Sequence, residues 1–261
     1  MRMQIRNMLA GLALMTMMTV VWADEAKDGP RTGYFRIKMT AVELLGADGA
    51  QSIAGILAPD EKLEWQVYVP HSYDPSKPAG ALVFINRWGN SGGSRKSYNE
   101  LLEEKNLIWA GVLDAGDQTP MDERMMRSIL APTVLAQDYA LDPNRIYIGG
   151  FSGGAHVATI LATGKPGLFK GGMFVGGTVF WGDKLPPGID VIRQNRYVFV
   201  GGSNDVALNT MRRTAGSYKH AGVTNSKLIV MPNERQEMPG PLYLREAIEF
   251  LDDPTVTANS E

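Results

Sequence analysis

Residues 145–158 read RIYIGGFSGGAHVA, and this stretch decides the fold class. It opens with the apolar residues of a short strand, passes through Gly150-Phe151-Ser152-Gly153-Gly154, and continues with small residues suited to a helix. Small residues two positions on either side of a serine let a strand and a helix approach closely around a sharp, strained turn. We therefore predict that Ser152 lies at the apex of such a turn and is a nucleophile. A tight turn without chemistry is the alternative.

The same G-x-S-x-G spacing occurs a second time, around Ser91. Residues 87–90 separate Ser91 from the preceding apolar run, and Gly-Gly-Ser-Arg-Lys follows it. Because no strand arrives directly and no helix leaves directly, this match lacks the context that the turn requires. A flexible surface loop is the expected structure there.

Short apolar runs alternate with helical patterns on both sides of the Ser152 turn. The expected strands are Tyr34–Leu45, Glu64–Pro70, Ala81–Asn86, Leu107–Asp114, Arg145–Gly149, Gly172–Val179, Arg196–Gly201 and Lys227–Met231. The expected helices are Ser97–Asn106, Met121–Tyr139 with a kink at Pro132, Gly153–Gly164, Asp205–Ala221 and Pro241–Asp252. This order predicts an α/β fold, a mostly parallel central sheet with helices on both faces. In such folds the reactive residues follow the carboxyl ends of the strands.

Composition limits the classes of function. The 261 residues include 26 Lys and Arg against 28 Asp and Glu, and the formal charge of −2 argues against a nucleic-acid partner. Because there is no cysteine, disulfides, thiolate nucleophiles and cysteine-built zinc sites are excluded. The three histidines do not show a metal-ligand spacing, so we predict no metal and no cofactor.

The first segment has the layout of a secretory signal peptide. Arg2 and Arg6 precede an uncharged run from Asn7 to Ala23, and acidic residues follow it. A membrane anchor is the alternative, but the run is shorter than the roughly 20 apolar residues that a span needs. We therefore expect a signal peptide at 1–23, a single domain at 24–252 and a flexible tail at 253–261. The mature chain would be secreted or periplasmic, without a stable membrane span.

The chain resembles the α/β-hydrolase superfamily, within the secreted esterases akin to polyhydroxybutyrate depolymerases and feruloyl esterases. The resemblance runs from about Trp65 to Asp252. The segments that carry it are VYVPHSYDPSKPAGALVFIN, ALDPNRIYIGGFSGGAHVA and the region from VFVGGSND to EFLDD. It implies an α/β-hydrolase fold whose nucleophile, acid and base follow in this order along the chain. The implied acid is Asp205, just past a predicted strand; a helix N-cap is the alternative role for this residue.

The implied base is missing. The family places a proline after its last strand, then three residues, then the histidine; here Pro232 is followed at that spacing by Gln236. Glutamine has no group that titrates near neutral pH, so it cannot accept the serine proton. None of the three histidines lies in this loop: we expect His71 in a solvated turn, His220 at a helix end, and His156 in a packing role.

The expected oxyanion hole uses backbone N–H groups. One donor is Gly153, immediately after the nucleophile. The family supplies the second donor from a His-Gly pair after the strand at 81–86, where this chain has Asn86-Arg87-Trp88-Gly89. The N–H of Arg87 or Trp88 is the candidate; Trp88 has the alternatives of a pocket wall or a surface aromatic residue.

Two further carboxylates are expected near the rim of the site. Asp114 and Asp117 follow the next predicted strand, where they would contact polar substrate groups or lie in a solvated turn. The connection Gly182–Asn195 is short, so we expect no large lid over the site.

Three functions compete. The first is an esterase-like serine hydrolase with impaired or atypical catalysis, acting on a small-molecule or polymeric ester with water, Glu234 or Glu237 as proton acceptor. The second is a pseudoenzyme that binds a ligand or partner. The third, a doubly wound binding domain without hydrolase ancestry, leaves the order of Ser152 and Asp205 unexplained.

Overall fold

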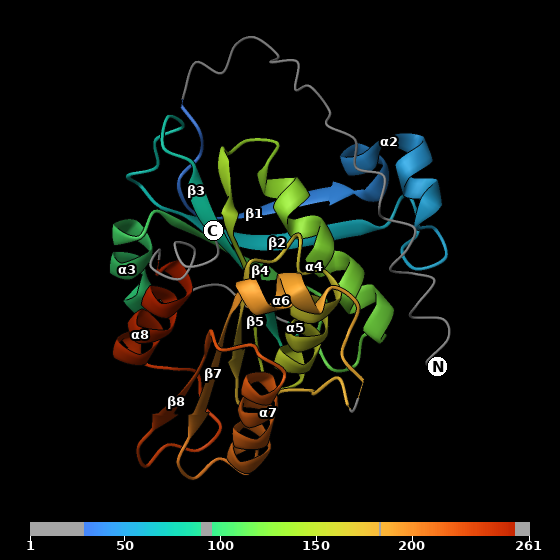
Figure 1. The fold of residues 1–261 in the computed structure, drawn as a ribbon. Coiled ribbons are helices and arrows are strands. Elements are labelled where there is room, and N and C mark those ends of the chain that lie inside the picture. Colours follow the sequence, from blue (N-terminus) through green and yellow to red (C-terminus); the bar gives the residue numbers. More distant parts are fainter. Residues whose placement is uncertain (1–28, 90–95, 183, 254–261) are drawn as a thin grey trace. The chain divides into compact units, whose positions relative to one another are not determined.

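A single eight-stranded sheet organises the protein (Figure 1). The computed structural model describes residues 29–89, 96–182 and 184–253, so the predicted signal peptide, the Ser91 loop and residues 254–261 of the tail lie outside the described residues. The strand order is β1-β2-β4-β3-β5-β6-β7-β8. Antiparallel pairing joins β1 to β2 and β2 to β4, and all the other neighbours are parallel. The predicted mostly parallel sheet is confirmed.

The elements follow the expected alternation. The strands are β1 (Gly33–Thr40), β2 (Lys62–Val69), β3 (Ala79–Asn86), β4 (Leu107–Val112), β5 (Leu141–Phe151), β6 (Gly171–Val175), β7 (Arg196–Gly202) and β8 (Ser226–Met231). The helices are α2 (Ala41–Ser52), α3 (Asn99–Glu104), α4 (Met121–Leu135), α5 (Gly153–Gly164), α6 (Ile189–Gln194), α7 (Leu208–His220) and α8 (Pro241–Asp252), with a short 3₁₀ turn at Lys96–Tyr98.

Helices cover both faces of the sheet. Figure 1 shows α3 and α8 on one side and α4, α5 and α7 on the other. Every residue of β3 from Ala79 to Ile85 is buried, as a strand covered on both faces requires. Beneath α3 and α8, aromatic and aliphatic side chains of the seven strands β2 to β8 form one continuous core that includes Trp109, Phe84 and Tyr147. Burial of this apolar surface supplies most of the free energy that holds the sheet and helices together.

Two predicted strands are too long. The strand expected at 34–45 ends at Thr40 because a capping box starts α2 there: the Glu43 N–H donates to Thr40 Oγ1 (3.2 Å), and the Thr40 N–H donates to Glu43 Oε2 (2.6 Å). The strand expected at 172–179 ends at Val175 because Gly176 takes a positive φ of 59°.

Two helices besides α2 differ from expectation. The short helix α6 was missed, and it lies inside the short connection Gly182–Asn195. Helix α4 runs through Pro132 and ends at Leu135, four residues earlier than predicted. Among the described residues no helix is both long enough and apolar enough to cross a bilayer.

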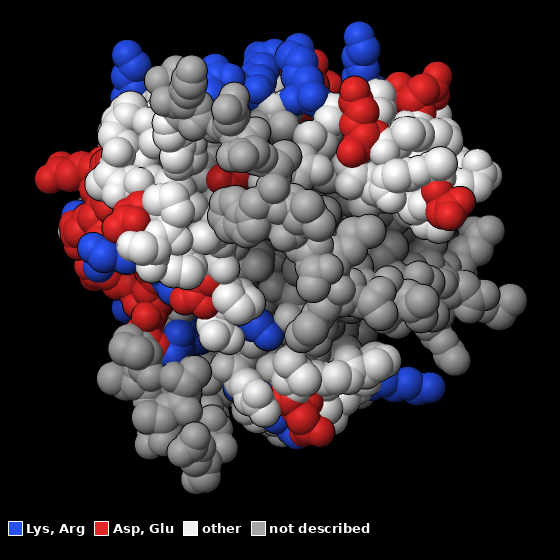
Figure 2. Space-filling model, turned by 90° about the horizontal axis from the view of Figure 1, so that it is seen from above, with Lys and Arg blue, Asp and Glu red and all other residues white. Residues whose placement is uncertain are grey.

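The surface carries charges of both signs. On the face shown in Figure 2, acidic side chains gather on the left flank, and several basic side chains lie along the upper edge. The described part of this face is therefore not a continuous patch of one charge.

Candidate active site

Ser152 stands at the sharp turn between β5 and α5. Its φ of 54° and ψ of −116° are strained for a residue with a side chain. The Ser152 N–H donates to the carbonyl oxygen of Val175 at the end of the neighbouring strand (2.8 Å), which fixes the turn against the sheet. The predicted strand-to-helix turn is present, at the carboxyl end of β5.

The glycines around Ser152 are required by close backbone packing. A Cβ on Gly150 would overlap the carbonyl group of Gly154, and a Cβ on Gly154 would overlap the carbonyl oxygen of Ile85 in β3. These neighbours are backbone atoms that cannot rotate away. The strand and the helix therefore approach more closely than any side chain at either position allows.

The loops after β7 and β8 are joined by backbone hydrogen bonds. The Ser203 N–H donates to the carbonyl oxygen of Met231, the Asn204 N–H to that of Glu234, and the Asn233 N–H to Ser203 Oγ, each at 2.8 Å. These bonds hold the loop that carries Asp205 against the loop that carries Gln236. Two residues 31 positions apart in sequence thus meet at one edge of the sheet.

Asp205 and Gln236 both face Gly176, at the end of β6. A Cβ on Gly176 would lie 2.7 Å from Gln236 Cγ, and 3.4 Å from both Gln236 Nε2 and Asp205 Oδ2. The Gln236 Nε2 donates to the carbonyl oxygen of Gly176 at 2.6 Å. The amide is therefore tied to the backbone beside the carboxylate of Asp205.

The two oxygens of Asp205 have different surroundings. Oδ1 accepts from the Ala207 N–H at 2.8 Å, which stabilises the turn leading into α7. The N-cap of α7 is Ala207, so Asp205 is not the helix N-cap that was the alternative role for it. Oδ2 is buried and has no hydrogen-bond partner within the described part of the chain. An unpaired buried acceptor is costly, so this oxygen lies where an N–H donor is needed.

Arg87 reaches Ser152 with its side chain, a contact that the sequence did not predict. Its Nη1 lies 3.3 Å from Ser152 Oγ, in a geometry that lets the guanidinium donate. Its Nε lies 3.6 Å from Asp117 Oδ2, and Arg124 Nη2 donates to Asp117 Oδ1 at 3.1 Å. Asp117 is thus held between two cations, and its carboxylate packs directly against the Cα of Gly153.

Trp88 is a weak candidate for the second oxyanion donor. Its N–H lies 3.3 Å from Asn86 Oδ1 and is bonded within its own turn. The indole is 63% exposed, and its ring centroid lies 5.6 Å from that of Phe151. These contacts favour the alternative in which Trp88 covers the edge of the sheet.

Two groups produce a positive electrostatic potential at Ser152. Gly153 begins α5, and the N-terminus of a helix carries a partial positive charge. The guanidinium of Arg87 adds a full charge next to Ser152 Oγ. The backbone carbonyl of Arg87 accepts from the Asp117 N–H at 2.7 Å, so the loop that carries Arg87 is fixed.

His156 is the nearest of the three histidines to Ser152 in sequence. It lies one turn into α5, and a Cβ on Gly177 would lie 3.3 Å from its Cδ2 and 2.6 Å from the carbonyl oxygen of Ser152. Desolvation lowers the pKa of His156, and the charge of Arg124 lowers it too, while the carboxylate of Asp117 acts in the opposite direction.

The alternative proton acceptors Glu234 and Glu237 and the two remaining histidines lie in loops or at a helix end. Glu234 and Glu237 are exposed residues of the loop after β8. His71 pairs with Thr32 (Nδ1 to Oγ1, 3.2 Å), and His220 is the last residue of α7. Across the described ranges, no three His, Asp or Glu side chains gather in a way that would hold a metal ion.

Comparisons with known proteins rest on three-dimensional structure. No protein-family model matches the chain, and no curated protein matches it. The feruloyl esterase module of Clostridium thermocellum in complex with sinapinate is similar, with a TM-score of 0.55 at 14% identity over 88% of this chain and 94% of that one. Thermogutta terrifontis esterase 2 phosphonylated by sarin has a TM-score of 0.55 at 16% identity, over 77% of this chain and 91% of that one.

A larger protein shares the same architecture. Porphyromonas gingivalis dipeptidyl peptidase 4 is similar, with a TM-score of 0.55 at 20% identity over 74% of this chain. The match covers 34% of the peptidase, so this chain spans about a third of its length. Identities this low establish architecture and leave activity open. With its eight-stranded sheet and its strained serine turn, the chain has the α/β-hydrolase fold.

Proposed function

We propose that the chain is an esterase-like serine hydrolase with impaired catalysis. One observation carries the proposal: Ser152 sits on a strained turn at the same sheet edge as Asp205, whose Oδ2 is buried without a partner. The side chain beside that carboxylate is Gln236, where the family resemblance implies the histidine. A nucleophile and an acid are present, and the group that would carry a proton between them is a glutamine.

The chemistry follows from these groups. Ser152 Oγ attacks the carbonyl carbon of an ester, and the bond to the alcohol breaks as the acyl group passes to the serine. The N-terminus of α5 and the Arg87 guanidinium stabilise the negative charge that develops on the carbonyl oxygen. Water then releases the acid from the serine.

Removal of the hydroxyl proton of Ser152 limits the rate of the proposed reaction. Since Gln236 cannot accept the proton of Ser152, water or one of the exposed carboxylates Glu234 and Glu237 takes it. A triad that lacks one member retains about 10³–10⁴-fold acceleration over water, through binding and the oxyanion hole. We expect turnover in that range, far below that of an esterase with a complete triad.

The substrate class of this proposal is a small-molecule or polymeric ester. The similar solved structures include esterases, which supports an ester in general terms. The connection from β6 to β7 contains only the six-residue helix α6 besides its loops, too little chain for a lid domain.

Export is part of the same proposal. It rests on residues 1–23, with their two arginines followed by an uncharged run. Mass spectrometry of the protein from periplasm and medium tests it: the expected N-terminus is Asp24. A chain that keeps Met1 in the cytoplasm contradicts it.

A fluorophosphonate probe tests the nucleophile. We expect slow labelling at one residue, Ser152, located by peptide mass spectrometry, and no labelling of the Ser152→Ala variant. Labelling as fast as in an ordinary serine esterase would contradict impaired catalysis. No labelling of Ser152 after a long exposure would contradict the nucleophile itself.

The second candidate is a pseudoenzyme that binds a ligand or partner at the same site. The observation in its favour is that the guanidinium of Arg87 contacts Ser152 Oγ and is itself paired with Asp117, so a cation engages the nucleophile. This function predicts that a candidate ester binds wild type and the Ser152→Ala variant equally, without turnover in either.

A further inference from the structure

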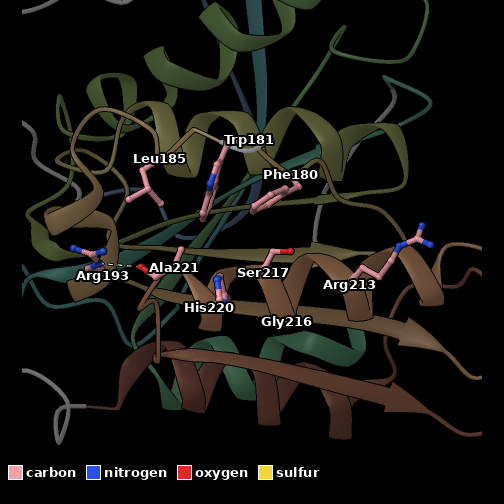
Figure 3. Close-up of a pocket in the computed structure, with 10 residues that line it drawn as sticks. Phe180, Trp181, Leu185, Arg193, Arg213, Gly216, Ser217, His220 and Ala221 are labelled. Atoms are coloured by element: carbon pink, nitrogen blue, oxygen red, sulfur yellow. Dashed lines mark hydrogen bonds between the residues drawn. The ribbon is translucent and has the colours of Figure 1, made fainter.

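A groove of about 770 Å³ lies between the chain that follows β6 and one face of α7 (Figure 3). Phe180, Trp181 and Leu185 project from the β6 side, and Ser217 and His220 face them from the helix. This volume lies within the range of about 300–1,000 Å³ that is usual for small-molecule sites.

The β6 side of the groove is aromatic and firmly supported. The Trp181 ring centroid lies 4.7 Å from that of Phe180 and 4.4 Å from that of Tyr218. Tyr218 is fully buried and packs edge-on against Tyr197, at 5.2 Å between centroids. Trp181 thus rests on the core, and Leu185, 51% exposed, extends the apolar wall. Such a wall favours a flat apolar ring.

The helix side of the groove is cationic. The sequence of α7, LNTMRRTAGSYKH, contains no acidic residue, and Arg213 and His220 line the groove. Arg193 closes one end, where its Nε donates to the carbonyl oxygen of Ala221 and its Nη1 pairs with Asp190 at 2.9 Å.

The charge at the two ends of the groove differs. Asp190 balances the charge of Arg193, whereas Arg213 Nη2 donates to the neutral hydroxyl of Thr210, at 3.2 Å. None of the described residues that line the groove is acidic. The available positive charge is therefore that of Arg213.

The groove is separate from the Ser152 site. Helix α7 begins at Leu208, three residues after Asp205, but its groove-lining residues start at Arg213. At 1.5 Å per residue they lie about 8–20 Å farther along the helix axis, towards the opposite sheet edge, where β8 begins. A ligand in the groove does not need Ser152.

We propose that this groove is a second binding site, for a small aromatic molecule that carries a negative charge, such as an aromatic carboxylate. Its ring packs on Phe180 and Trp181, and its anion pairs with Arg213, which lies at the opposite end of the groove from Leu185 and Arg193 (Figure 3). Charge complementarity and the flat apolar wall together select this class over neutral or cationic molecules. This site is additional to the esterase-like function and does not depend on it.

Isothermal titration calorimetry with three matched compounds tests the proposal on the purified protein. The compounds are 2-naphthoate, 2-naphthylmethanol and 2-naphthylmethylammonium, which share a ring system and differ in charge. We expect 2-naphthoate to bind at least about 10-fold more tightly than either of the others, the usual worth of one charge-assisted hydrogen bond. No saturable binding of 2-naphthoate up to about 1 mM overturns the proposal, since that limit lies above ordinary small-ligand dissociation constants.

Two neighbouring arginines give a matched pair of variants. Arg213 lines the groove, while Arg212 is exposed on the same helix and does not line it. We expect Arg213→Gln to weaken the binding of 2-naphthoate about 10-fold and to leave the binding of 2-naphthylmethanol unchanged. Arg212→Gln should change the affinity for neither compound. Equal losses of 2-naphthoate affinity in the two variants would indicate a general attraction between charges, and would contradict the proposed site.

Two further variants locate the ligand. Trp181→Leu should weaken both naphthyl compounds by a similar factor, with an unchanged circular dichroism spectrum as the folding control. Arg87→Gln should leave 2-naphthoate binding unchanged. If Arg87→Gln abolishes binding and Arg213→Gln does not, the anion lies at the Ser152 site and the groove proposal is wrong.

Discussion

The turn at Ser152 and the loop at Gln236 meet at one edge of the sheet, but different forces determine their shapes. Around Ser152 the constraint is backbone packing: side chains at Gly150 or Gly154 would overlap carbonyl groups. At Gln236 the loop is held by hydrogen bonds of its backbone, through residues 231–234. The identity of residue 236 is therefore nearly independent of the fold, while the glycines of the turn are not.

Under the proposed function, this difference explains how the fold keeps the serine turn while position 236 is free to vary. A change at Gly154 would disrupt the sheet itself, so the turn persists for structural reasons. A change at position 236 leaves the loop in place, because the bonds that hold it are made by residues 231–234 with Ser203 and Asn204. The presence of the serine turn is thus weaker evidence for catalysis than the residue that faces it.

The largest expected effect is on the Ser152 turn. Gly154→Ala places a methyl group against the carbonyl oxygen of Ile85, and neither backbone can give way. We expect a loss of at least about 3 kcal/mol in the free energy of unfolding, measured by urea denaturation, or no folded protein.

Gly216 provides the control. It also lies in a helix, α7, but a Cβ there would meet no atom within 4 Å. Gly216→Ala should therefore stabilise the protein by about 0.5–1 kcal/mol, the usual helix preference for alanine. If both variants change stability by similar amounts, close packing is not what constrains the turn.

The second-largest expected effect is an increase in ester hydrolysis when a base is introduced into the loop after β8. Gln236→His supplies a base beside Asp205, whose Oδ2 is free to accept its N–H. We expect hydrolysis of p-nitrophenyl acetate to rise about 100-fold, the lower end of what general-base catalysis provides. Initial rates at saturating ester measure it.

Three variants control this gain. Gln236→Ala should not raise the rate, Ser152→Ala added to Gln236→His should abolish the rise, and Asp205→Asn should reduce it. A rise that survives Ser152→Ala would come from the imidazole alone, and the arrangement of the three groups would not be a latent triad.

The smallest expected effect is on stability, and it comes from the contact between Gly176, at the end of β6, and Gln236. Gly176 has a φ of 59°, and a Cβ there would lie 2.7 Å from Gln236 Cγ. Gly176→Ala should cost about 1–2 kcal/mol in stability from backbone strain, plus the cost of displacing Gln236.

A double-mutant cycle isolates the contact. Gln236→Ala removes Cγ and with it the crowding, so the cost of Gly176→Ala should be smaller in the Gln236→Ala background. The coupling free energy from urea denaturation is expected to be about 0.5–1 kcal/mol. A coupling of zero would mean that Gln236 moves aside without cost.

The sequence predicts most of the sheet and the position of Ser152, because both depend on local patterns. Continuous apolar runs mark buried strands, and the glycines around Ser152 reflect backbone distances that no other residue permits. The meeting of Asp205 and Gln236 also follows, since both come after neighbouring parallel strands. Helix α2 was missed although its capping box, Thr40 to Glu43, was visible: the apolar residues that follow continue the strand-like composition.

The side chain of Arg87 and the groove beside α7 were beyond sequence reasoning. Arg87 reaches Ser152 because Asp117, 30 residues away and itself fixed by Arg124, orients its guanidinium. A long side chain has many rotamers, and which one is occupied depends on such distant partners. The groove likewise exists only where α7 meets the segment after β6, two regions whose contact no local pattern records.

The unpaired Oδ2 of Asp205 also bears on how this protein can be altered by evolution or design. A buried acceptor without a partner costs about 1–3 kcal/mol, a large share of the 5–15 kcal/mol that stabilises a typical domain. Stabilising substitutions should therefore be unusually easy to find at and around Asp205, and each would fill or neutralise the place that a catalytic imidazole needs. Under the proposed function, selection of this chain for thermal stability alone would remove the place where a catalytic base could be introduced.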